Sequence, residues 1–346
     1  MFNRLFGSVS KDIGIDLGTA NTLVYVRDRG IVINEPSVVA VNTLTDQILA
    51  VGQDAKLMVG KTPAHIVASR PLVNGVVSDF EVTEKMLKHF IDKVHRESFS
   101  IFPRPRVVIA IPLGVTEVER KAVEDAAKNA GAKEVILIEE PMAAAIGSRL
   151  PVQESTGTMI VDIGGGTTEM AVIALGGVVN WRSLRTAGDD LNQDIVNFCR
   201  DEFNLLIGER TAESAKMQLG SAMPLEEELE IRIRGRDLIT GLPREIPFTT
   251  RHVRAALDRT INMIIDNIRS TIETTPPELV ADIYERGIMI TGGGSLLKRI
   301  DERISQATNI PVHVVDDPLT AVARGTGVVL EDLDTLKKTI LFTSGS

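Results

Sequence analysis

Two stretches of this chain, DIGIDLGTANTLVYV (12–26) and MIVDIGGGTTEM (159–170), follow one pattern. In each, an apolar run ends in an aspartate, Asp16 or Asp162, which is followed by glycine and threonine. The flanking residues are rich in β-branched side chains and are interrupted by further glycines, which is typical of antiparallel hairpins. Each phrase is therefore predicted to form the first turn of a three-stranded meander.

The repetition continues downstream of both phrases. In each half of the chain a buried strand, a helix, a second strand and an acid-acid-proline phrase follow in the same order. The last phrase is expected to start an alanine-rich helix that ends at glycine. Four matches in one order predict a duplicated α/β domain. The first strands are 106–112 and 287–291, and the helices begin at Thr116 and Ser295. The second strands are 133–138 and 311–315, and the acid-acid-proline phrases with their helices are 139–147 and 316–325.

Composition favours a cytoplasmic globular protein with room for two domains. The chain has 346 residues, of which 43% are hydrophobic and 25% charged, and a formal net charge of −9. The negative charge argues against a nucleic-acid binder, since no basic field is available. The single cysteine, Cys199, excludes an intramolecular disulfide. No apolar run reaches the roughly 18–20 residues that cross a bilayer, and no signal peptide is predicted.

The two aspartate-glycine turns suggest phosphate chemistry. Glycine lets the backbone approach a phosphate, and successive N–H groups form an anion cradle. A carboxylate beside phosphate makes sense when it faces Mg²⁺, usually through water. Neither turn contains lysine or opens straight into a helix, which excludes the Walker pattern and disfavours the dinucleotide fingerprint. Either turn alone is explained more simply as a glycine hairpin; the pair within a duplicated framework favours a phosphate site.

Other candidate residues keep two interpretations each. Glu140 could position a water or act as a general base, but Glu-Glu-Pro is also a good negatively charged helix start. Gly292–Gly294 could offer a smooth surface to a base or ribose, or simply form a tight turn. The hydroxyls of Thr19, Thr22, Thr167 and Thr168 could donate to phosphate or reflect strand preference.

Four motifs resemble the phosphate-1, phosphate-2, connecting and adenosine motifs of the actin/Hsp70/sugar-kinase superfamily. They are DLGTANT (16–22), DIGGGTTE (162–169), IEEPMAAAIG (138–147) and ITGGGSLL (290–297). Further segments are similar to the MreB/Mbl family of bacterial actins, so that the resemblance covers nearly the whole chain. These segments are GIVINEPSVVA (30–40), RPLVNGVVSDFEVTEKML (70–87), LIGERTAE (206–213), TPPELVADI (275–283) and DDPLTAVARGTG (316–327).

The resemblance implies an α/β, actin-like ATPase fold with duplicated ribonuclease-H-like lobes, each carrying a smaller inserted subdomain. Its four subdomains would be IA (1–32, 77–145 and 318–346), IB (33–76), IIA (146–182 and 247–317) and IIB (183–246).

The resemblance also implies roles for individual residues at a site for ATP and Mg²⁺. Asp16 and Asp162 would serve the metal, and Glu140 with Thr167 would set up the hydrolytic water. Without the resemblance, Glu213 and Lys216 would be interpreted as a favourable surface pair; with it, they reach the ribose and adenine. Phosphate contacts would come from Gly18, Thr19, Ala20, Asn21, Gly164, Gly165, Gly166 and Thr168, and Gly292, Gly293 and Gly294 would border the adenosine.

Three classes of function share this superfamily. A metabolite kinase would need a second polar pocket for its acceptor, and the sequence offers no further constellation for one. A chaperone would need a peptide-binding domain after the ATPase, for which we expect no room. The MreB/Mbl resemblance implies an actin-like filament that hydrolyses ATP slowly during assembly and maintains rod shape by organising cell-wall elongation. Its implied partners are further copies of itself, inner-membrane lipids and cell-wall elongation proteins such as RodZ, MreC and MreD, with no nucleic acid.

Two apolar spots suggest a peripheral location on the inner face of the cytoplasmic membrane. One is the start of the chain, where apolar residues lie at helical spacing; the other is the loop 98–105. Both could instead cover a neighbouring strand or the core, and the resemblance favours membrane insertion. Because the chain is acidic, local apolar burial would have to drive binding. The residues concerned are Phe2, Leu5, Phe6, Phe99, Ile101 and Phe102.

Overall fold

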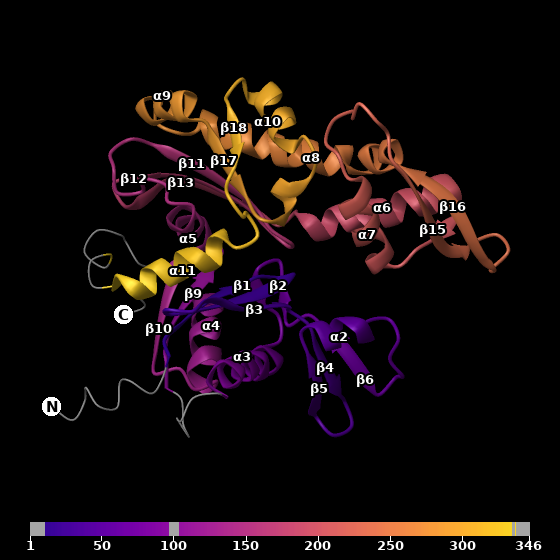
Figure 1. The fold of residues 1–346 in the computed structure, drawn as a ribbon, viewed down its shortest axis with the longest axis horizontal. Helices are drawn as coiled ribbons and strands as arrows, with labels where there is room; N and C mark the ends of the chain where they lie inside the picture. Colours follow the sequence, from indigo (N-terminus) through magenta and orange to yellow (C-terminus); the bar gives the residue numbers. More distant parts are fainter. Residues whose placement is uncertain (1–10, 97–103, 334–335, 337–346) are drawn as a thin grey trace.

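The computed structural model describes residues 11–96, 104–333 and 336, which form two lobes around two five-stranded sheets (Figure 1). The sheet of lobe I has the order β10-β9-β1-β2-β3, and that of lobe II the order β13-β12-β11-β17-β18. The strands of lobe I are β1 (Ile13–Leu17), β2 (Asn21–Val26), β3 (Gly30–Pro36), β9 (Arg106–Ile111) and β10 (Glu134–Glu139). Those of lobe II are β11 (Thr158–Ile163), β12 (Thr168–Ala174), β13 (Gly177–Leu184), β17 (Ile288–Thr291) and β18 (Val312–Val314).

The two sheets are copies of one topology, which confirms the predicted duplication and the α/β fold class. In each, an antiparallel meander is extended by two parallel strands. Asp16 and Asp162 occupy matching places, near the end of the first strand and beside the neighbouring parallel strand, where they pair with Ala110 and Thr291. The topology thus brings both aspartates to the carboxyl edges of their sheets, where ligands of α/β folds bind.

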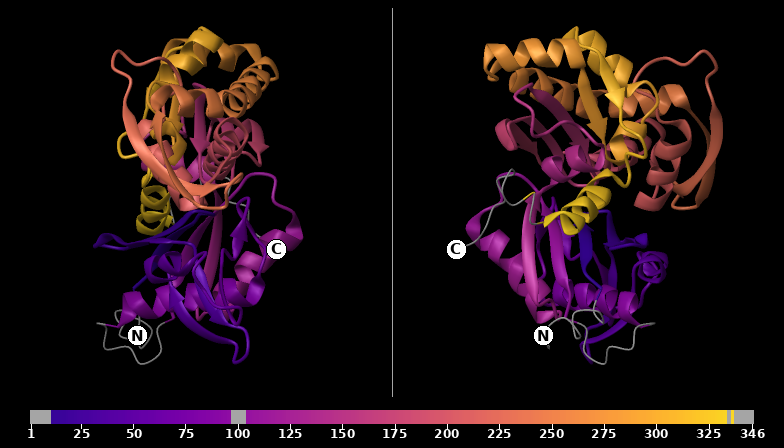
Figure 2. Two further views of the ribbon diagram at one scale, coloured as in Figure 1. Left: turned by 90° about the vertical axis from the view of Figure 1, so that its right-hand side faces the viewer. Right: turned by 60° about the vertical axis from the view of Figure 1, so that its left-hand side comes forward.

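Helices cover both faces of each sheet and fill the space between the lobes (Figures 1 and 2). One apolar core lies under α3 (Phe80–His95) and α4 (Glu117–Asn129) in lobe I, and another under α8 (Thr250–Glu273) and α9 (Pro277–Arg286) in lobe II. A third core is shared, because α5 (Glu140–Gly147) and α11 (Ala321–Glu331) pack between the sheets with Val108 of β9 and Ile160 of β11. Among the described residues, none of the helices is both long and apolar enough to span a bilayer.

The α5–α11 contact corrects one expectation. Helix α11 begins at Ala321, after the acid-acid-proline phrase, and continues through Gly325 to Glu331 instead of ending at glycine. A Cβ on Gly325 would collide with the carbonyl oxygen of Ala143, and one on Gly147 with that of Ala321. Glycine is therefore used at both positions for close helix packing, and at Gly325 it does not stop the helix.

The segment after β17 differs from the prediction in a similar way. No α-helix starts at Ser295; the chain forms a 3₁₀ turn, Gly293–Leu296, and the helix α10 (Ile300–Thr308) begins later. Between them Lys298 forms a β-bridge with Ser221, and its carbonyl accepts from Ala222 N at 2.8 Å. Tertiary pairing with the insert of lobe II has overridden the local helix signal.

Each lobe carries an insert, as expected. The insert of lobe I contains β4 (Val39–Asn42), β5 (Gln47–Val51), β6 (Ile66–Ser69) and α2 (Gln53–Met58), and is followed by the hairpin β7 (Leu72–Val73) and β8 (Val76–Val77). The insert of lobe II contains α6 (Gly188–Phe203), α7 (Glu209–Leu219), β14 (Leu205–Leu206), β15 (Glu230–Asp237) and β16 (Pro243–Thr249). The four subdomain boundaries remain a prediction.

The tight α5–α11 packing predicts a cost for a single methyl group. Alanine at Gly147 should favour the helix intrinsically, yet its Cβ has no room, so Gly147→Ala should lower the free energy of unfolding by about 2 kcal/mol. Gly208, which has no neighbour within 4 Å of an added Cβ, supplies the control, and Gly208→Ala should change stability by less than about 0.5 kcal/mol. Urea denaturation would compare them; equal stability of the two variants would contradict the packing argument.

Candidate functional site

The two glycine turns lie against one another across the lobes. A Cβ on Gly165 would stand 2.6 Å from the Cβ of Ala20, and a Cβ on Gly166 would stand 2.7 Å from Oγ1 of Thr19. Residues that are far apart in the sequence therefore form one site, to which each lobe contributes one turn. This is the arrangement expected from the repeated phrase.

Hydrogen bonds hold the turn of lobe I in place. Ser37 Oγ donates to the carbonyl of Gly18 at 2.6 Å and lies 2.8 Å from Oγ1 of Thr22. Gly75 N donates to Oγ1 of Thr19 at 2.8 Å. Asn21 uses its amide on Oδ1 of Asn34, at 3.3 Å. The hydroxyl of Thr22 is thus used for structure, and that of Thr19 already accepts one bond.

The turn of lobe II is closed by its own backbone. Gly164 N donates to the carbonyl of Thr167 at 2.9 Å, and the carbonyl of Gly164 accepts from Gly188 N, the first residue of α6. Thr168 is fully buried, and its hydroxyl donates to the carbonyl of Thr186 at 2.7 Å. Its predicted phosphate contact would therefore have to use the backbone, and it stays a prediction.

Carboxylates gather behind the turns. Burial, with the charge of Asp162, raises the pKa of Asp16 to about 8, and burial raises the pKa of Asp162 to about 7. Glu140, at the start of α5, is 8% exposed. Burial and then the charges of Glu169, Asp16 and Asp162 raise its pKa well above the ordinary value. The site therefore concentrates negative charge where water is scarce, which is costly unless a cation or protons neutralise it.

This charge fits a bound Mg²⁺ that is shared with a phosphate ligand. Within the described residues no three acidic, histidine or cysteine side chains are grouped closely enough to hold a metal alone. Asp16 and Asp162 would therefore need phosphate oxygens and water to complete the six oxygen ligands that Mg²⁺ prefers. The water-mediated metal role of both aspartates stays a prediction.

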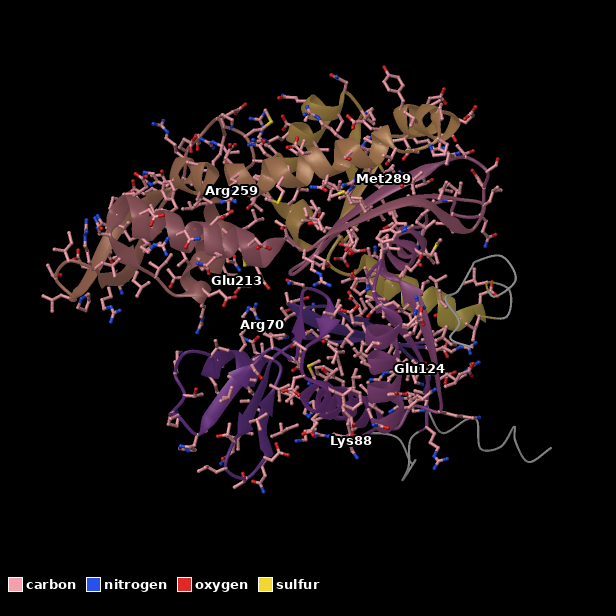
Figure 3. The ribbon with its side chains drawn as sticks, turned by 180° about the vertical axis from the view of Figure 1, so that it is seen from behind. Arg70, Lys88, Glu124, Glu213, Arg259 and Met289 are labelled. Carbon is pink, nitrogen blue, oxygen red and sulfur yellow. The ribbon has the colours of Figure 1, made fainter. Side chains whose placement is uncertain are left out.

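The expected ribose and adenine residues lie on α7, facing lobe I. Figure 3 shows Glu213 across the interlobe gap from Arg70. Glu213 forms an ion pair with Lys56 of α2 at 3.0 Å, and Lys216 Nζ donates to the carbonyl of Gly188 at 2.7 Å. Glu213 and Lys216 thus bond to other residues and not to each other as a surface pair. Both lie near the start of α6, next to the turn of lobe II.

Arg70 adds a second bridge between the inserts, which the sequence did not indicate. Its guanidinium pairs with Asp189 of α6 at 3.0 Å and with Glu209 of α7 at 2.5 Å. All three side chains are partly exposed, so each pair is worth about 0–1 kcal/mol. Together with Lys56–Glu213, these pairs join the insert of lobe II to lobe I.

Gly292–Gly294 pack against the end of β11. A Cβ on Gly292 would collide with Oδ1 of Asp162, and one on Gly294 with the side chain of Ile163. Gly292 also has a φ of 79°, which favours glycine. Tight packing thus accounts for these glycines, while Gly293, with only Leu319 within 4 Å of an added Cβ, remains the one of the three that is free to border a ligand.

Glu169 is a site residue that the sequence analysis did not single out. It lies on β12 opposite Asp162 and is 1% exposed. An acidic residue inside the otherwise uncharged strand TEMAVIA is the signal that could have identified it. Near it, a cavity of about 260 Å³ opens between the lobes, lined by Thr167, Leu113, Trp181 and Arg185 among others.

The membrane candidates Phe2, Leu5, Phe6, Phe99, Ile101 and Phe102 lie outside the described residues.

Comparison with known proteins agrees with this geometry. The family model described as MreB/Mbl protein matches residues 10–338. This chain belongs to the MreB/Mbl family. It is 51% identical to the cell shape-determining protein MreB of Escherichia coli K12, over 96% of this chain and 97% of that protein. It is 48% identical to the cell shape-determining protein Mbl of Bacillus subtilis 168, over 95% and 98% respectively.

Solved structures confirm the actin-like fold of the family. MreB5 of Spiroplasma citri bound to ADP superposes with a TM-score of 0.89 at 38% identity, covering 95% of this chain and 98% of that one. The same protein bound to AMPPNP gives a TM-score of 0.90.

The raised pKa of Asp162 predicts how stability depends on pH. In the unfolded chain this carboxyl titrates near pH 4, and in the folded chain at about 7. Between these values only the folded state holds the proton, so stability is lost as pH rises through that window. Asp162→Asn has no carboxyl to titrate at this position, so it should not lose this stability. Without nucleotide or divalent cation, the free energy of unfolding of the variant minus that of wild type should therefore rise by about 2 kcal/mol from pH 5 to pH 8.

Denaturation at several pH values would measure this difference. Asp266→Asn, at an exposed position on α8, is the matched control and should follow wild type. A gap between Asp162→Asn and wild type that stays constant with pH would contradict the prediction.

Proposed function

We propose that this chain is an actin-like cytoskeletal ATPase that assembles into membrane-associated filaments with Mg-ATP. Through these filaments it would maintain rod shape by organising cell-wall elongation. The observation that carries the proposal is the contact between the two glycine turns, with the buried carboxylates of Glu140 in lobe I and Asp162 in lobe II behind them. Such a site suits a polyphosphate with its cation, because backbone N–H groups would meet the phosphates and acids would meet the metal.

The relatives support this proposal. The Escherichia coli and Bacillus subtilis proteins are named as cell shape-determining, and MreB5 of Spiroplasma citri has been solved with ADP and with AMPPNP. We extend to this chain the nucleotide and the role in cell shape, and we propose the filament from the actin-like fold that it shares with MreB5. Further copies of itself, inner-membrane lipids and elongation proteins such as RodZ, MreC and MreD would be its partners.

The proposed chemistry is slow hydrolysis at the end of the triphosphate. Mg²⁺ would neutralise developing phosphate charge. Glu140 and Thr167 would orient the attacking water: Glu140 is the first residue of α5, directly after β10 of lobe I, and Thr167 lies in the turn of lobe II. Hydrolysis would therefore need both lobes in register, which couples it to the interlobe contacts and, through them, to assembly.

Turnover kinetics and electron microscopy test this proposal together. ATP turnover per subunit should rise with protein concentration, need no added acceptor, and accompany filaments visible with ATP and vesicles. Glu140→Ala should bind ATP with near wild-type affinity but hydrolyse it at least about 100-fold more slowly, since positioned acid–base groups contribute about that much. Glu227→Ala, an exposed acid in the insert of lobe II, is the matched control.

Two results would contradict this proposal. Linear dependence of turnover on an added sugar or acid would favour a kinase instead of a filament. Normal hydrolysis by Glu140→Ala would remove Glu140 from its role.

Membrane association is tested by liposome co-sedimentation. Removing residues 1–6 should weaken sedimentation and leave ATP binding intact, because apolar insertion would drive the contact of this acidic chain. Adding Phe99→Ser and Phe102→Ser to the truncation should weaken it further. Unchanged sedimentation of the combined variant would defeat this part of the proposal.

A further inference from the structure

Glu169 is a buried carboxylate with both oxygens engaged by donors from different lobes. Leu113 N, in the loop that follows β9 of lobe I, donates to one oxygen at 2.8 Å. Ser183 Oγ, on β13 of lobe II, donates to the other at 2.5 Å. Since β12 itself belongs to lobe II, this side chain joins the loop of one lobe to two strands of the other.

The loop held by Glu169 adjoins the residues proposed for hydrolysis. Ile111, the last residue of β9, pairs with Glu139 of β10, immediately before Glu140. Thr167 is two positions before Glu169 along the chain. Through its bond from Leu113, Glu169 is therefore connected to the end of β9, next to the strand that precedes Glu140. Along its own backbone, Glu169 is connected to the turn that carries Thr167.

The same loop has little room to shift. A Cβ on Gly75 would stand 2.5 Å from Cγ of Pro112 and 3.3 Å from Cγ2 of Thr167, and a Cβ on Gly114 would stand 2.6 Å from the ring of Trp181. Glycines thus allow the loop to close tightly on lobe II. Within this packing the bond from Leu113 N to Glu169 defines the position of the backbone.

The environment of Glu169 also argues for a role beyond packing. Burial raises its pKa to about 7, against the opposing effect of the bonds from Ser183 and Leu113. Burial raises the pKa of Glu140 well above its ordinary value, and the charge of Glu169 raises it further. A buried acid next to other acids costs stability that an apolar side chain would not cost.

We propose that Glu169 is a positioning residue for ATP hydrolysis. It fixes loop 112–115 of lobe I against β12 and β13 of lobe II, and so holds Glu140 and Thr167 in register at the phosphate end of the site. This inference rests on the proposed ATPase function. It assigns Glu169 no contact with nucleotide, so binding and turnover should respond differently to its replacement.

Three variants test the role. Glu169→Ala removes both bonds and should lower kcat on the order of 10- to 100-fold, because small misplacements of reacting groups cost that much. The Kd for ATP should change less than about 3-fold. Glu169→Gln can still accept from Leu113 N and donate to Ser183 Oγ, so it should keep kcat within about 3-fold of wild type. Ser183→Ala removes one bond and should fall between these two.

The assays would use the full chain at concentrations where sedimentation shows equal assembly, with turnover expressed per pelleted subunit. Wild-type kcat in Glu169→Ala would overturn the proposal. Equal losses of kcat and ATP affinity would also overturn it, since they indicate a general structural role, as would a Glu169→Gln variant as slow as the alanine variant. If Glu169→Ala fails to fold, Ser183→Ala decides the question: unchanged kcat in that variant overturns the proposal.

Failure of the underlying function gives a different result. If wild type and Glu169→Gln neither bind nor hydrolyse ATP, the ATPase proposal is wrong. If wild type turns over ATP, Glu140→Ala is slow and the Glu169 variants match wild type, only the role of Glu169 is wrong.

Discussion

The gathering of the buried acids Glu140, Asp162 and Glu169 and the half-buried Asp16 is the constraint on which the organisation of this molecule depends. The four acids come from β1, α5, β11 and β12, and burial raises the pKa of each. Without a cation, such a cluster favours either protonation or separation of the lobes. A ligand that brings both positive charge and phosphate oxygens would remove the free-energy cost of holding ionised acids close together. Binding of such a ligand would therefore stabilise the arrangement in which the lobes are together.

Beside the contact of the two turns and the bond from Leu113 to Glu169, two further contacts between the lobes differ in stiffness. At the helix pair, α5 and α11 form a shared apolar core with backbone-to-backbone approaches at Gly147 and Gly325, and such packing resists deformation. Near the inserts, Arg70 and Lys56 form partly exposed ion pairs that are individually weak and screened by salt. Any change in the angle between the lobes would therefore cost less at the inserts than at the packed helix pair α5 and α11.

The sequence predicted those features that depend on local periodicity and misjudged those that depend on tertiary contact. The duplicated meanders, the helix that begins after Thr116 and both turns follow from short-range patterns. The prediction of a helix end at Gly325 is wrong because the close approach of this glycine to Ala143 exists only after the lobes pack. Arg70 pairs with Asp189 and Glu209, which lie on the other lobe. No rule of sequence spacing connects Arg70 to these two partners.

The difference between the two turns now has a structural explanation. The turn of lobe I carries side chains, Thr19 and Ala20, at the positions that face Gly165 and Gly166 of lobe II. Side chains on both turns would hold the lobes apart by at least a methyl group, and the backbone of the second turn could not come close to the first. Gly165 and Gly166 of DIGGGTTE are thus required by the first turn before any ligand is considered, whereas Gly164 lies against Thr167 of its own turn and donates its N–H to the Thr167 carbonyl. Proximity to phosphate would be a consequence of this fit, because the two glycines without side chains bring the backbone of the second turn up to the first.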